Sequence, residues 1–189
     1  MNSSPSPGRE TWLGALYATL AYGAWGLMPV YWKWVGTVPP LQMVAHRVLW
    51  SVPVLLALVG LLGRSRELAR ALTSRHDLPP LLATAALISA NWLIFIWAIQ
   101  AGYILNASLG YYINPLLNIL LGMVFLGERL RRVQTLAVVL AGLAVLNLTV
   151  ALGIVPWISL ALALTFGFYG LLRKTARVDG LLGLTVETL

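Results

Sequence analysis

The segment Tyr22–Leu27, which reads YGAWGL, is matched later in the chain by Phe166–Leu171, which reads FGFYGL. The second copy begins 144 residues after the first (166 − 22), and a basic residue follows each copy at the same offset, Lys33 and then Arg177. Five apolar segments separate the two starts, and an odd number of membrane crossings turns the second copy upside down. Inverted repeats of this kind are typical of secondary transporters, which bind substrate between two halves.

The composition indicates a chain that is embedded in lipid. Hydrophobic residues make up 59% of the sequence and charged residues 10%, whereas soluble domains carry about 25% charged residues. The absence of cysteine excludes disulfides and thiolate metal sites. The net charge of +7 does not indicate nucleic-acid binding, because the bases lie in short loops between apolar segments and not along one amphipathic face.

Six continuously apolar stretches come close to the roughly 20 residues that a helix needs to cross a bilayer. Their approximate bounds are 12–34, 42–63, 79–100, 105–127, 133–150 and 155–172. Continuous apolar runs favour helices over the alternating strands of a barrel. The first stretch is long enough to remain as a span, so we do not expect a cleaved signal peptide.

The loop charges predict the orientation of these helices. Eleven of the thirteen Lys and Arg residues fall in the N-terminal tail and in the loops after the second, fourth and sixth stretches. By the positive-inside rule these loops and the N-terminus are cytoplasmic. The first stretch then runs outward and the sixth inward, which is the inversion that the repeat requires.

A last apolar run, from about Gly180 to Leu189, is far too short to span and is expected to be the start of a seventh helix. The predicted fold is therefore an all-α, polytopic membrane protein with six full transmembrane helices plus the start of a seventh. We expect a disordered cytoplasmic tail over 1–10, a first five-helix repeat over 11–150 and the start of a second repeat over 151–189. The sequence leaves open whether the chain is a fragment or a naturally truncated product.

The stretch 105–127 is the most polar of the six. Small and amide residues recur there every four positions and form one slowly drifting stripe, made of Gly110, Asn114, Asn118 and Gly122. Two interpretations stay open: hydrogen-bonded contact between helices, or a substrate-facing wall at mid-membrane, joined by Tyr111. Asn91, a lone amide in the third stretch, has the same two interpretations.

Arg47 lies about two turns into the second stretch. It either extends to the outer interface or forms a fixed cation in a cavity, where it would attract an anionic or zwitterionic substrate. Glu187 is the acid that could pair with it, although the two residues enter the membrane from opposite faces. The first five stretches contain no interior acid, so cationic drugs are not specially favoured.

Most tryptophans, Trp92 among them, are expected near helix ends as an interfacial belt. Trp25 and Tyr169 instead occupy matching places in the two repeats and are candidates to line a shared cavity. The glycine pairs of the two copies, Gly23 with Gly26 and Gly167 with Gly170, predict close packing between the two repeat-starting helices.

Motifs of enzymes and metal sites are absent from the sequence: it has no H-E-x-x-H, G-x-S-x-G or Walker loop, and no His/carboxylate cluster. We therefore expect no enzyme activity, no cofactor and no metal site.

Several stretches resemble RarD-type members of the EamA family, in the drug/metabolite transporter superfamily. They are His46-Arg47 with Trp50-Ser51, Asn91-Trp92, Phe95–Ala98, Ala107–Tyr111, Asn114–Leu116, Asn118, Gly122–Arg129, Phe168–Leu171, Arg173-Lys174 and Glu187–Leu189. The resemblance implies ten helices in two inverted five-helix halves, in the bacterial inner membrane. This chain departs from that pattern by ending after six full stretches.

The leading expectation is a permease of small organic solutes or drugs that works by alternating access, as an exporter. Its path would be lined by Trp25, Asn91, Gly110, Tyr111, Asn114 and Asn118, with Arg47 as the charge contact. The alternative is a non-transporting membrane subunit or an inactive fragment of a ten-helix transporter. The expected partners are a small-molecule substrate and the lipid bilayer, and a homo-oligomer stays open.

Overall fold

The computed structural model describes residues 7–153, 156–176 and 178–189, and these ranges contain helices and no strand. The helices are α1 (Pro7–Trp34), α2 (Pro40–Leu61), α3 (Ser65–Thr73), α4 (Leu78–Gln100), α5 (Ile104–Leu126), α6 (Arg132–Leu152), α7 (Trp157–Thr175) and α8 (Gly180–Thr188). One compact unit ends at Thr37 and contains α1, and a second comprises residues 38–189. Arg177, the base predicted to follow the second repeat copy, lies outside the described residues.

The six long helices coincide with the six apolar stretches of the sequence. Within the described residues, four helices are long and apolar enough to cross a membrane: α2, α4, α5 and the segment Arg132–Ala151 of α6. These four helices support an all-helical membrane protein. α1 and α7 are not among them, so six full spans remain a proposal. α1 begins at Pro7, inside the segment expected to be a tail, and residues 1–6 lie outside the described ranges.

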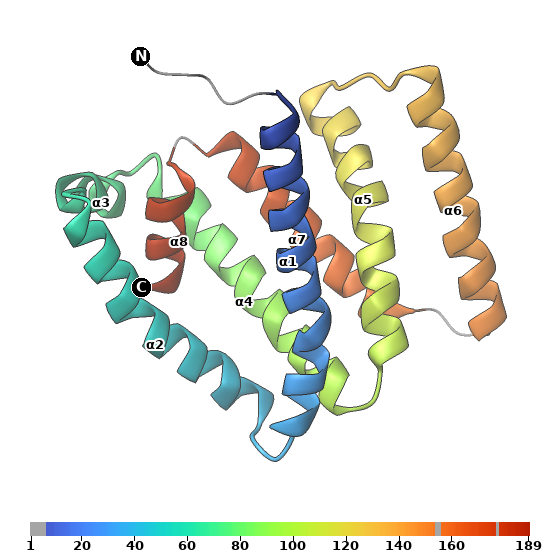
Figure 1. Ribbon diagram of the computed structural model, residues 1–189, viewed down its shortest axis with the longest axis horizontal. Helices are drawn as coiled ribbons and strands as arrows, with labels where there is room; N and C mark the ends of the chain where they lie inside the picture. Colours follow the sequence, from blue (N-terminus) through green and yellow to red (C-terminus); the bar gives the residue numbers. More distant parts are fainter. Residues whose placement is uncertain (1–6, 154–155, 177) are drawn as a thin grey trace. The chain divides into compact units, whose positions relative to one another are not determined.

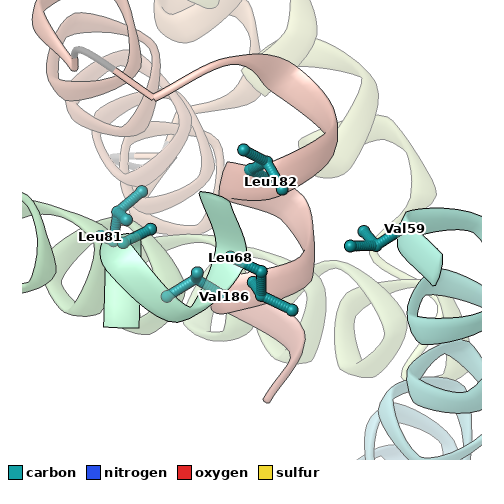
Figure 2. Packing of buried hydrophobic residues seen from close by; sticks show 6 residues of the cluster. Val59, Leu68, Leu81, Leu182 and Val186 are labelled. Carbon is teal, nitrogen blue, oxygen red and sulfur yellow. The ribbon is translucent and has the colours of Figure 1, made fainter. Parts of the chain in front are cut away.

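α3 is a short helix in a segment that the sequence indicated only as a charged loop. Its Leu68 and Ala71 are buried, while Arg66 and Arg70 are exposed, so the helix is amphipathic. The buried side chains of α3 join a cluster with residues from α2, α4 and α8. The cluster is shown in Figure 2 and comprises Val59, Leu68, Ala71, Leu81, Leu182 and Val186.

α7 packs against both α4 and α5, and glycines let it approach α5 closely (Figure 1). A Cβ added at Gly110 of α5 would lie 3.1 Å from the backbone oxygen of Ser159 and 3.1 Å from the Cβ of Leu162. A Cβ added at Gly167 of α7 would lie 2.8 Å from the Cδ2 of Leu117. Small residues at both positions therefore allow the two helices to meet at short range.

The contacts along α7 establish the direction in which it runs. Near its start, the Ser159 hydroxyl donates to the Asn106 carbonyl at the start of α5 (2.6 Å). Near its end, Lys174 pairs with Glu128, which follows α5. α5 and α7 are therefore parallel. α4 runs the opposite way, since Trp97 near its end contacts Trp157 at the start of α7, with ring centroids 5.7 Å apart.

α6 packs against α5 (Figure 1), and most of its described side chains are exposed. α5 ends at Gly127, whose φ of +65° reverses the chain direction at a position that favours glycine. The apolar side chains of α6 then face outward, among them Leu136, Leu140 and Leu143. A helix with this exposure in a chain of this composition is suited to contact with lipid.

Candidate functional site

Arg47 of α2 lies against an aromatic ring of α4. Its Cζ atom is 3.5 Å from the centroid of the Trp92 ring, which is the geometry of a cation–π contact. The interaction explains how a permanent cation is held within an apolar helix, because the ring face offers partial negative charge where water is scarce. Trp92 was expected in an interfacial belt, but it lies well inside α4 and supports the Arg47 guanidinium.

A cavity of about 530 Å³ lies between α2, α4 and α8, with Arg47 and Trp92 on its wall. Its volume falls within the roughly 300–1,000 Å³ of small-molecule sites. In Figure 1, α8 lies between α2 and α4, and its residues Leu184, Glu187 and Thr188 line the cavity. The remaining wall is mostly apolar, with a few hydroxyls: Val44, Val48, Trp50, Ser51, Val54, Leu55, Ile88, Ser89, Leu184, Glu187 and Thr188.

Glu187 also lines this cavity, but its charge is compensated from α7. Its side chain is only 2% exposed, and its Oε1 lies 3.6 Å from the Nε of Arg173. The Tyr169 hydroxyl donates to its Oε2 at 3.3 Å. Glu187 thus pairs with Arg173 and not with Arg47, the partner considered from the sequence. Tyr169, a candidate cavity residue, does not line the cavity itself; its hydroxyl binds Glu187, which does.

Four of the residues predicted to bind substrate meet at a different place, where α4 and α5 face α7. Asn91, Gly110, Tyr111 and Asn114 surround a gap of about 10 Å³, roughly the space that one water requires. The Asn91 Nδ2 donates to the Leu162 carbonyl at 2.9 Å and to the Thr165 hydroxyl at 2.8 Å. Asn91 thus ties α4 to α7, the four residues lie where three helices meet, and their contact with substrate stays a prediction.

Two further predicted site residues, Asn118 and Arg47, are not on the wall of this gap. Asn118 is exposed on α5, and its Oδ1 faces Gly170 of α7, where an added Cβ would lie 3.9 Å from it. Trp25 belongs to the other compact unit, which contains α1. Arg47 alone of the predicted set lines the large cavity. The packing predicted between the glycines of α1 and those of α7 likewise stays a prediction.

A charged cluster joins α3 to the start of α8. Arg64 binds the Glu67 Oε2 at 2.6 Å and also pairs with Asp179. Asp179 caps α8 by accepting the backbone N–H of Leu182 at 3.1 Å. The Arg64 guanidinium lowers the pKa of Glu67 and, together with the Leu182 N–H, the pKa of Asp179, because each contact favours the ionised carboxylate.

Residues 12–150 match the family described as EamA-like transporters, and this range is well over half of the chain. The chain belongs to the EamA-like transporter family. It is 51% identical over 176 residues to an uncharacterized transporter of Vibrio cholerae, a match that covers 93% of this chain and 58% of that protein. The family match together with the apolar helices of this chain supports a membrane transporter.

Two further relatives carry the name RarD. The protein RarD of Salmonella typhi is 46% identical over 181 residues, which cover 96% of this chain and 62% of that protein. The chloramphenicol-sensitive protein RarD of Pseudomonas aeruginosa is 38% identical over 180 residues, with coverage of 93% and 60%. The chain thus spans about three fifths of the length of these EamA-family relatives. No solved structure matches it.

Proposed function

We propose that this EamA-family chain acts in a secondary transporter that moves small organic solutes, drugs among them, across the inner membrane. The observation that supports the proposal most strongly is the cavity of about 530 Å³ between α2, α4 and α8. It combines a mostly apolar wall with one fixed cation, Arg47, which is the kind of lining that small-molecule sites use. Export is the direction predicted from the sequence.

The relative directions of α4, α5 and α7 support the alternation of the six proposed spans, and the loop charges support a cytoplasmic N-terminus. Consecutive spans alternate in direction, and α4, α5 and α7 are the third, fourth and sixth proposed spans. α4 and α7 should therefore be antiparallel and α5 and α7 parallel, which agrees with their contacts. The clusters at Arg64 and at Lys174 lie at the loops predicted to be cytoplasmic.

The walls of the cavity support alternating access between two halves. α2 and α4 precede residue 150, where the family match ends, and α8 follows it. A site built from both predicted repeats opens or closes when one repeat moves against the other. In this proposal α8 is the wall that the second repeat contributes, because it is the helix lining the cavity that follows residue 150.

Filling the cavity tests the proposal. The variant Ser89→Trp places an indole at a residue that lines the cavity, whereas Ala144→Trp places one on the exposed face of α6. Both proteins would be reconstituted in vesicles and assayed for exchange of labelled chloramphenicol, benzoate and phenylalanine. We expect exchange by the wild type and by Ala144→Trp, and its loss in Ser89→Trp.

Two results would count against this function. Exchange that survives in Ser89→Trp would show that solute takes another path through the protein. Absence of exchange and of ligand-induced stabilisation in the wild type would favour the non-transporting membrane subunit that the sequence also left open.

A further inference from the structure

We propose that the cavity between α2, α4 and α8 selects singly charged organic anions with an apolar body, such as aromatic carboxylates, and that Arg47 binds the anionic end. The inference rests on the transport function proposed above and names the substrate class of that site. It follows from the charges that face the cavity, from the geometry of Arg47 and from the nature of the remaining wall.

The fixed charges of the cavity sum to one uncompensated cation. In the described part of the chain, Arg47 forms no ion pair with an acid, and its contact is the neutral ring of Trp92. Glu187, the one acid on the wall, is paired with Arg173 and also accepts from Tyr169. A ligand that enters therefore meets the positive charge of Arg47, which no acid in the described ranges pairs, and the carboxylate of Glu187, which Arg173 already pairs.

The stacked geometry leaves Arg47 able to bind a carboxylate. With the Cζ atom 3.5 Å from the ring centroid, Trp92 covers a face of the guanidinium. The N–H donors lie in the guanidinium plane and point outward from its edges, where two of them match the two oxygens of a carboxylate. The ring thus fixes the orientation of the cation without occupying its donors.

Of the three hydroxyls on the wall, those of Ser51 and Thr188 add little competing donor capacity, and the third, that of Ser89, is uncharged and so a weaker donor than Arg47. The Ser51 hydroxyl donates to the Arg47 carbonyl at 2.7 Å, and the Thr188 hydroxyl donates to the Leu184 carbonyl at 2.6 Å. A hydroxyl has one hydrogen to donate, so both side chains are left as acceptors. Arg47 is consequently the strongest donor that the cavity offers to an anion.

The rest of the wall favours an apolar body. Trp50, Leu55, Ile88 and Leu184 contribute aromatic and aliphatic surface around the same space. A small inorganic anion would leave that surface unused, and a polyanion would bring charge that no second free cation balances. A zwitterion would need a free carboxylate for its ammonium group, and Glu187 is 2% exposed and already paired.

The test uses four probes of similar size and different charge: benzoate, benzamide, benzamidine and phenylalanine. Binding to the full chain in lipid nanodiscs would be followed by tryptophan fluorescence, because Trp50 and Trp92 line the cavity. We expect benzoate to bind at least about tenfold more tightly than the other three probes, the effect of one desolvated charge-assisted contact.

Matched variants assign the preference to the proposed residue. Arg47→Gln should abolish the benzoate preference, Arg47→Lys should keep part of it, and Arg66→Gln, on an exposed arginine outside the cavity, should keep all of it. Glu187→Gln should tighten benzoate binding, because it leaves Arg173 uncompensated. Thermal unfolding of each variant would confirm that it is folded.

The outcomes separate this inference from the transport proposal. If benzamide and benzamidine bind and exchange as well as benzoate, or if the preference survives in Arg47→Gln, the anion site is wrong while transport stands. Tightest binding of phenylalanine, lost in Glu187→Gln, would also overturn the inference in favour of a zwitterion. If none of the four probes binds or exchanges, the anion site is wrong, and if chloramphenicol does not exchange either, the transport proposal fails as well.

Discussion

Gly110 sets how closely α7 approaches α5. A Cβ added there would meet backbone and Cβ atoms of Ser159 and Leu162 at 3.1 Å, which cannot rotate out of the way. Gly167 differs, because its Cβ would meet the flexible ends of Leu117 and Leu121. The crossing of these two helices therefore depends more on Gly110 than on Gly167.

Replacing Gly110 by Ala is expected to lower the free energy of unfolding by about 1–3 kcal/mol, the usual cost of overpacking. Gly142→Ala on α6 is the matched control, because a Cβ there meets nothing within 4 Å. The free energy of unfolding of the control should rise by about 0.5–1 kcal/mol, because alanine loses less backbone entropy on folding than glycine does. Thermal unfolding in detergent measures both, and equal melting temperatures for the two variants would contradict this account of the crossing.

Asn91 allows its two interpretations to be separated. Its amide makes two hydrogen bonds to α7, at 2.9 and 2.8 Å. Asn91→Leu should destabilise the protein by about 1 kcal/mol, the scale of hydrogen bonds between membrane helices. Asn147→Leu, on the exposed α6, should leave the stability unchanged. A variant of Asn91 that keeps its stability but loses solute exchange would favour cavity lining over helix packing.

At the scale of elements, α8 is fastened to α3 by the Arg64 cluster. Glu67 and Asp179 have pKa values below their ordinary range. Carboxylates of this kind stabilise the folded state while they are ionised, and the contribution is lost as the pH falls through the unfolded and then the folded pKa. The attachment of α8 should therefore be strong at neutral pH and weaken below about pH 4.

Arg64→Gln tests this dependence. At about pH 7 the variant should melt at a lower temperature than the wild type, and at about pH 3 the difference should shrink, since the carboxylates are then largely neutral in both proteins. Arg75→Gln, another exposed arginine in the same loop region, should melt like the wild type at both values. A difference of the same size at both pH values would exclude the Arg64 cluster as its source.

The long helices were predictable because their length and apolar composition are local properties. Stretches such as 79–100 and 105–127 agree with α4 and α5 to within a residue at each end. α3 was missed because its many arginines were interpreted only as loop charge, although Leu68 and Ala71 already lie three residues apart on one helical face. Its partners in α2, α4 and α8 depend on tertiary packing, which periodicity does not encode.

At the scale of the molecule, the cysteine-free sequence permits a direct test of six spans. Single cysteines at Arg66, Ala151 and Thr175 would be labelled with a membrane-impermeant maleimide in intact cells. We expect the sites at 66 and 175 to be protected and the site at 151 to react, because α7 would place positions 151 and 175 on opposite sides of the membrane. Reaction of both 151 and 175 from the same side would show that α7 does not cross the membrane.

The candidate site was predictable only in part. Arg47 stood out because a permanent charge is costly in an apolar helix. Its contact with Trp92 requires the relative rotation of α2 and α4, which no local pattern gives. The polar stripe of α5 is visible in the sequence, but its Asn114 and Gly110 meet α7 around a gap of about 10 Å³ and do not line the large cavity.

The position of α7 between α4 and α5 has a consequence for how the protein is made. α7 supplies both hydrogen-bond acceptors of Asn91 and fills the surface beside Gly110. A nascent chain that has emerged from the ribosome only as far as α6 therefore presents an unsatisfied amide and an open groove to lipid. α4 and α5 reach their final packing only once α7 has been synthesised, so the order of insertion becomes part of the assembly.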